Sequence, residues 1–262
     1  MSVTDDISRL YARIDDLCGR ADRGEIGISD FLSPRELHFA ESYLARKGVN
    51  AVSYGGYGGA ERKRIYVLPD YMEDVNHVSQ LSDFGHSVCI AALEVKSAGY
   101  RRLTHRDYLG AVLGLGIERA VIGDILVVGE DGGGAVIFCD EPLAFFLSTE
   151  LVKIASEKVR CSIADLDGIA VPERRTAAIN DTVASPRIDC VVGALCSFSR
   201  EKSREAVVSG LVEIDFETEQ RPDRLIHAPC MISVRNVGRF CVVSVEDKTK
   251  KGRYRLVAEK FL

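Results

Sequence analysis

Basic side chains recur in the segment from residue 185 to residue 262, and their types and spacing suit the binding of phosphate oxygens. Arginine presents a planar fork of donors and lysine a compact point charge, so a stiff array of both can hold an anionic backbone. Arg200 and Arg204 are one helical turn apart and would share a face. Two basic turns follow, at 235–239 and 248–253. The competing interpretation of such charges is a solvated surface with no ligand.

The candidate binding residues are the basic and capping residues at the predicted helix starts and turns of this segment. They are Arg187, Ser199, Arg200, Lys202, Arg204, Arg235, Arg239, Lys248, Lys250, Lys251 and Arg253.

Two short helices and several strands must position these side chains. The first helix is predicted from an apolar stripe at i, i+3, i+4 and i+7, formed by Ile188, Val191, Val192 and Leu195. Ser199 can cap a second helix, which Ser209-Gly210 would end. Residues 211–214 and 231–234 are predicted strands. The expected result is a compact helix pair and hairpin with cations at its corners.

This segment resembles the S4 domain, a small RNA-binding module. The similarity lies in S-x-R-[LI]-D at 185–189, in S-R-x-x-[AS]-R at 199–204, and in the glycine before a valine-rich strand. The resemblance implies that residues 185–262 are an S4-like domain. On that basis we expect Arg187, Arg200, Lys202 and Arg204 to contact phosphates of one RNA helix, and the later basic residues to extend the contact along it.

The N-terminal region, residues 1–80, is predicted to be a mixed α/β domain. Ser33 followed by Pro34 marks a helix start. The glycines of 53–60 match neither common phosphate-loop spacing, which favours a flexible turn. The cations at 62–64 precede a strand, and they either add to an RNA surface or lie at a solvated strand end.

The middle region, residues 81–165, shows the order β-α-β-β-α-β. This order predicts a ferredoxin-like plait, as in the RRM, with two helices on one face of a four-stranded sheet. An RRM stacks bases on aromatic side chains of its central strands, and here those strands offer Phe138 alone. We therefore expect that this sheet does not read bases as an RRM does. The overall fold class is α+β, with residues 166–184 predicted as a linker to the C-terminal domain.

Composition restricts the function classes. The 262 residues carry a formal charge of −5, yet residues 183–262 hold 14 Lys and Arg against 11 Asp and Glu, which leaves −8 for the rest. A mildly basic tail on an acidic body suits a module that finds RNA selectively. The eight cysteines form no C-x-x-C pair, which argues against a metal site or a disulfide framework. Without a signal peptide or long apolar run, we expect a cytoplasmic protein with no membrane partner and no cofactor.

Along nearly its whole length the chain resembles the YlmH family of bacterial S4-domain proteins. The similarity rests on characteristic runs at 31–36, 61–64, 103–110, 115–119, 122–125 and 248–253, together with the S4 residues above. The resemblance implies a non-enzymatic RNA-binding protein that works on the large ribosomal subunit in ribosome-associated quality control. Its expected partner is rRNA, with tRNA as a second candidate. The resemblance implies no small-molecule substrate. A photosynthetic branch of similar proteins is tied to photosystem function.

Two other function classes stay open. One is an RNA-modifying enzyme, a pseudouridine synthase or methyltransferase, that uses the S4 domain for targeting. Asp107 and Asp124 are the candidate catalytic carboxylates, although a helix cap and a turn explain them better. The kinase-like triplet at 105–107 lacks the asparagine that should follow it. The other class is a protein-interaction module whose basic face is incidental.

Overall fold

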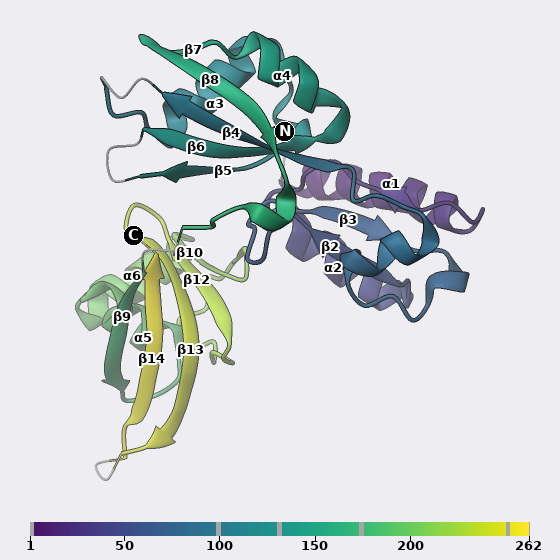
Figure 1. Ribbon diagram of the computed structural model, residues 1–262. Coiled ribbons are helices and arrows are strands. Elements are labelled where there is room, and N and C mark those ends of the chain that lie inside the picture. The colour runs from purple at the N-terminus through teal and green to yellow at the C-terminus, as the bar shows by residue number, and fades with distance from the viewer. Residues whose placement is uncertain (1–2, 98–100, 130–132, 173–175, 250–251, 262) are drawn as a thin grey trace. The chain divides into compact units, whose positions relative to one another are not determined.

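The computed structural model describes residues 3–97, 101–129, 133–172, 176–249 and 252–261. The chain divides into two compact units, Met1–Pro172 and Glu173–Leu262 (Figure 1). Each unit combines helices with antiparallel sheets, which agrees with the expected mixed class. Among the helices in these ranges, none is both long and apolar enough to cross a bilayer.

The N-terminal part of the first unit is a small three-stranded sheet with helices on it. Its elements are α1 (Val3–Ala21), β1 (Gly27–Ile28), α2 (Pro34–Lys47), β2 (Ala51–Tyr54) and β3 (Arg64–Val67), followed by the 3-10 turns η1 (Asp70–Met72) and η2 (Val78–Phe84). The sheet order is β1-β3-β2. Ser33 caps α2, as the predicted helix start requires, and the structure adds a capping box with Glu36. Apolar side chains of α1 and α2 form a core with Ile65 and Val67 of β3.

The middle part follows the predicted order of elements, with one addition. It contains β4 (Ile90–Ser97), α3 (His105–Gly114), η3 (Arg119–Val121), β5 (Ile122–Val128), β6 (Gly134–Asp140), η4 (Glu141–Leu143), α4 (Ala144–Glu150), β7 (Lys153–Ile154), β8 (Glu157–Ala164) and η5 (Leu166–Gly168). The sheet order β5-β6-β4-β8-β7 is that of a βαββαβ plait with β7 added at one edge. The second helix ends at Glu150, and β7 and β8 form a hairpin directly after it.

The glycine-rich segment at 53–60 contains the predicted turn, between β2 and β3, and part of this turn packs against the plait. Phe31, Ile90, Ala92, Val136 and Phe138 form a core on the sheet face opposite the helices, and Tyr57 packs on it. The Tyr57 ring stacks on Phe138 at 5.0 Å between centroids. A Cβ on Gly56 would lie 2.3 Å from the Phe138 ring, so only glycine permits this approach.

Two arginines predicted as surface cations are instead used inside the first unit. Arg62 donates to the carbonyl oxygens of Phe31 (2.6 Å) and Ile122 (3.0 Å). Arg64 is 5% exposed, donates to Asp140 Oδ1 at 2.9 Å, and lies over the Phe31 ring. Neither a free RNA surface nor a solvated strand end describes them. They join the N-terminal part to the plait.

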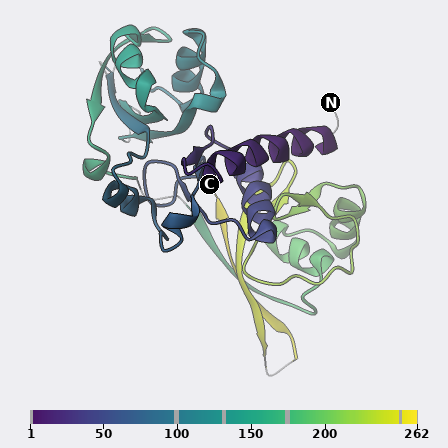
Figure 2. The same ribbon diagram turned by 90° about the vertical axis from the view of Figure 1, so that its right-hand side faces the viewer.

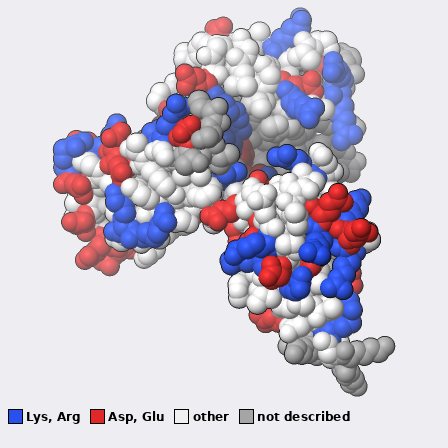
Figure 3. Space-filling model, turned by 180° about the vertical axis from the view of Figure 1, so that it is seen from behind, with Lys and Arg blue, Asp and Glu red and all other residues white. Residues whose placement is uncertain are grey.

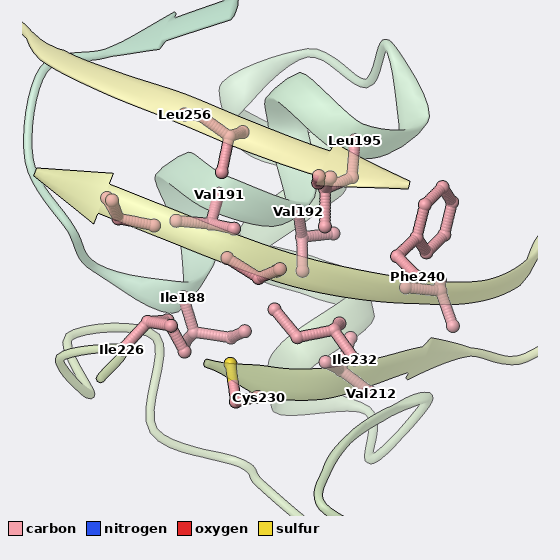
Figure 4. Close-up of a cluster of buried hydrophobic side chains, with 14 of the residues drawn as sticks. Ile188, Val191, Val192, Leu195, Val212, Ile226, Cys230, Ile232, Phe240 and Leu256 are labelled. Atoms are coloured by element: carbon pink, nitrogen blue, oxygen red, sulfur yellow. The ribbon is translucent and has the colours of Figure 1, made fainter. Parts of the chain in front are cut away.

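The second unit is a six-stranded sheet covered by two helices. It contains β9 (Thr176–Val183), α5 (Ile188–Cys196), α6 (Arg200–Val208), β10 (Val212–Ile214), β11 (Glu217–Thr218), β12 (Cys230–Val234), β13 (Gly238–Lys248) and β14 (Tyr254–Phe261), in the sheet order β11-β10-β12-β13-β14-β9. The predicted apolar stripe of the first helix faces the strands and meets Ile232, Phe240 and Leu256 (Figure 4). The boundaries of both helices agree with the sequence-based expectation.

The predicted linker at 166–184 is in part a strand. β9 pairs with β14 over eight residues, from Thr176 opposite Phe261 to Val183 opposite Tyr254. The linker prediction is therefore wrong for this stretch. Its polar composition reflects an edge strand whose residues are mostly exposed or half-buried, and the sequence gives no sign of so distant a partner.

Replacing Arg64 with methionine should lower the free energy of unfolding by about 2–4 kcal/mol, because the half-buried Asp140 carboxylate and the Cys89 carbonyl lose a donor that is itself buried. Urea denaturation followed by circular dichroism measures the effect. Lys63→Met is the matched control: Lys63 is half-buried beside it, and its replacement should change stability by less than about 0.5 kcal/mol. Equal transition midpoints for the two variants would contradict this role for Arg64.

Candidate nucleic-acid interface

The start of α6 presents the densest group of the predicted cations. Ser199 caps the helix, accepting a hydrogen bond from the Lys202 amide at 3.2 Å, so its role in the fold is capping as predicted. The side chains of Arg200, Lys202 and Arg204 are exposed. The Lys202 ammonium lies 3.9 Å from the centre of the Phe198 ring, which holds it in place. Glu201 and Glu205 lie on the same helix and reduce its net charge.

Two cysteine thiols of the helix pair have cations near them. Burial raises the pKa of Cys196 to about 11, and the ammonium groups of Lys260 and Lys202 act against that shift. Burial also raises the pKa of Cys190, with Arg187 and Arg200 acting against it. The Lys260 ammonium lies 5.7 Å from the centre of the Phe240 ring, on the sheet face that the helices cover, so Lys260 of β14 belongs to this group, although sequence analysis missed it. Lys260 lies opposite Phe240 in the pairing of β13 with β14, and no local sequence pattern predicts this pairing.

Arg187 is committed to a partner within the protein. Its guanidinium makes a bidentate pair with Asp189, with Nε–Oδ1 at 3.1 Å and Nη2–Oδ2 at 2.7 Å. The Asp189 side chain is 3% exposed, whereas that of Arg187 is 36% exposed. The pair fixes the entrance of α5 and leaves one edge of the guanidinium facing solvent.

The two predicted basic turns lie at opposite ends of one long strand. Arg235 and Arg239 flank the turn between β12 and β13, whereas β13 runs eleven residues from Gly238 to Lys248. Eleven residues of strand span about 33 Å, so the turns cannot act as one corner. Figure 2 shows the β13–β14 hairpin extending past the helices of its unit. The structure thus separates residues that were predicted to act together.

The turn between β12 and β13 belongs with the helix pair. A Cβ on Gly238 would lie 3.3 Å from the Lys260 side chain. A shallow hollow beside this turn is lined by residues that include Gly210, Glu213, Arg235 and Arg239. Arg239 directly precedes the core residue Phe240 in β13, so its side chain points to the sheet face away from the helices. We call the set Arg200, Lys202, Arg204, Arg235 and Lys260 the helix-pair group. Figure 3 shows Lys and Arg side chains mixed with acidic ones over this unit.

The far end of the hairpin is described in part. Arg253 donates to Thr182 through Oγ1 (2.9 Å) and the carbonyl oxygen (2.5 Å), and so fastens β14 to β9. Lys248 is the last residue of β13. Lys250 and Lys251 lie outside the described residues.

Both candidate catalytic carboxylates have structural partners. Asp107 accepts from the Thr104 amide at 2.8 Å and from its hydroxyl at 2.6 Å, which completes the predicted cap. These bonds hold the pKa of Asp107 below its usual value. Asp124 lies in β5, not in a turn, and accepts from the Tyr57 hydroxyl and from the amides of Glu61 and Arg62. It anchors the glycine-rich segment.

Comparison with known proteins yields consistent matches. Residues 81–167 match a family model described as "Putative RNA-binding domain in YlmH", and residues 9–72 match "YlmH, N-terminal". The Bacillus subtilis (strain 168) "Ribosome-associated protein quality control protein P2" is 31% identical over 234 residues, which is 89% of this chain and 86% of that protein. A solved structure, "Cell division protein ylmH from Streptococcus pneumoniae", is 24% identical with a TM-score of 0.49, covering 64% of this chain and 94% of its own.

Replacing Arg187 with methionine should destabilise the second unit by about 2–4 kcal/mol, because the buried Asp189 carboxylate loses its charged partner. Arg204→Met, on the exposed face of α6, should cost less than about 0.5 kcal/mol. Thermal and urea unfolding of both variants test this difference. If the Arg187 variant were as stable as the Arg204 variant, the pair with Asp189 would not be needed for stability, and Arg187 would be available for binding.

Proposed function

The chain belongs to the YlmH family, and from that premise we propose that it is a non-catalytic protein that binds structured RNA on the large ribosomal subunit. Its process is ribosome-associated quality control. The observation that carries the proposal is the helix-pair group, held by a folded core on one unit of an otherwise acidic protein. The C-terminal unit acts as an S4-like domain in this proposal. Ribosomal RNA is its main partner, with tRNA as a second, in the cytoplasm.

The electrostatics of the helix-pair group support recognition of an RNA backbone. Three of its five cations lie on α6, Arg235 directly follows β12, and Lys260 of β14 lies on the sheet face that the helices cover. Base edges in the A-form major groove are out of reach, so a rigid array of cations recognises the shape of the helix. The later predicted cations Lys248, Lys250 and Lys251 would then contact a separate stretch of RNA.

The alternative is an RNA-modifying enzyme that uses the S4-like unit for targeting. Asp107 and Asp124 are its candidate carboxylates, and both already satisfy protein donors. Because both carboxylates already accept hydrogen bonds within the protein, a binding role is favoured over catalysis. Binding of S-adenosylmethionine, or tritium release from labelled uridine RNA, would favour the enzyme instead.

The affinity for isolated large subunits should fall with salt, with a log–log slope of about −4 to −5 if about six phosphates are neutralised. Arg200→Glu with Arg204→Glu should make that slope shallower by about 2 and weaken binding by tenfold or more. Co-sedimentation over a salt series measures both quantities.

The matched control reverses the neighbouring acidic residues of the same helix. Glu201→Arg with Glu205→Arg changes as many charges in the opposite direction and should strengthen binding. If the first variant bound with unchanged affinity and slope, the helix-pair group would not be part of the interface.

A further inference from the structure

On the sheet face opposite α3 and α4, other side chains of the protein cover only about half of the middle sheet. The helices α3 and α4 cover its other face, with Leu93, Val95 and Ile137 among the buried residues. On the open face, Phe138 and Ala92 are fully buried beneath Tyr57 and neighbouring side chains. The position where an RRM stacks bases is therefore occupied by the protein itself. What remains exposed is the half formed by the ends of β4, β8 and β7.

Strand register places four cations on this exposed half. Residues directly opposite in antiparallel strands point to the same face, and so do residues two apart in one strand. Ala92 pairs with Phe138 and with Ala164, which fixes the open face. On β4 and β8 the same face then carries Lys96 opposite Arg160, with Lys158 two residues before Arg160. Lys153 of β7 lies opposite Lys158.

We call Lys96, Lys153, Lys158 and Arg160 the sheet quartet. All four are exposed. Lys96 lies 3.5 Å from Glu94 in an exposed ion pair. Within the described part of the chain, the other three have no ion-pair partner. The patch is therefore strongly cationic, with one carboxylate to offset it.

The pairing within the quartet works against the stability of the sheet. Like charges directly opposite each other in neighbouring strands repel, and the quartet contains two such pairs, Lys96 with Arg160 and Lys153 with Lys158. A sheet that served only to hold the fold would gain from opposite charges at these positions. A bound polyanion removes the repulsion, because each phosphate lies between two cations.

We propose that the sheet quartet is a second RNA-binding surface, which grips the phosphate backbone without reading bases. This proposal rests on the proposed function and assigns a face to the family's RNA-binding region. Neighbouring strands are about 4.8 Å apart and alternate residues about 6.8 Å apart, so the four cations have spacings close to those of successive phosphates. Successive phosphates of one strand can therefore each meet a cation of the quartet.

The experiment uses the full chain, ribosomal RNA extracted from large subunits, and intact large subunits. Lys158→Glu with Arg160→Glu should weaken binding to both probes by tenfold or more and make the salt slope shallower by about 2. The same variant converts both like-charge pairs into opposite-charge pairs, so its melting temperature should equal or exceed that of the wild type. Loss of binding then cannot be attributed to unfolding.

The control variant is Arg23→Glu with Arg46→Glu, which makes the same charge change at exposed positions of the N-terminal part. It should bind as the wild type does. If the quartet variant also binds as the wild type while Arg200→Glu with Arg204→Glu does not, the quartet proposal is wrong and the proposed function stands. If the quartet variant loses binding to subunits but not to extracted RNA, the partner is an acidic protein and the RNA assignment is overturned. If the wild type binds neither probe, both proposals fail.

Discussion

The contact between the glycine-rich segment and the plait determines what the first unit can present to a partner. Asp124 holds the segment through the Tyr57 hydroxyl and two backbone amides, and Arg62 and Arg64 reach across to carbonyl groups and Asp140. Because these charged groups are paired inside the protein, they stabilise the junction and do not serve as ligands for RNA. The same contact buries Phe138 beneath Tyr57. It therefore turns a sheet face that could have stacked bases into an interior, and it leaves cations on the remainder.

The two cationic surfaces differ in how the fold produces them. In the second unit, capping by Ser199 and a ring contact with Phe198 fix the cations of α6, so local sequence determines that part of the group, whereas Lys260 joins it only through the pairing of β13 with β14. In the first unit, cations from three strands meet because of register, and no short stretch of sequence contains them. A one-residue slip of β8 would move Arg160 to the helix-covered face, so the surface depends on correct pairing.

Sequence reasoning succeeded where the determinants are local. The helix start at Ser33, the cap expected at Asp107 and the apolar stripe from Ile188 to Leu195 predict helix starts and faces that the structure has. It failed where a distant strand decides the outcome. β9 was interpreted as linker because its partner lies at the other end of its unit, and Lys260 and the sheet quartet went unnoticed for the same reason. Arg62 and Arg64 were interpreted as surface charges because their acceptors, carbonyls and Asp140, come from elsewhere in the chain.

The pairing of β9 with β14 bears on the order in which the protein folds as it is synthesised. Partners in this pair are separated by 71 to 85 residues, and β9 lies at the sheet edge with β14 as its neighbour. Such non-local pairing forms slowly, because the entropy of closing a long loop is lost before any stabilising contact forms. The first unit has all of its strands by residue 164 and can fold while translation continues. In the second unit, β9 stays unpaired until β14 has been synthesised, so the first unit can be complete before the sheet of the second unit closes.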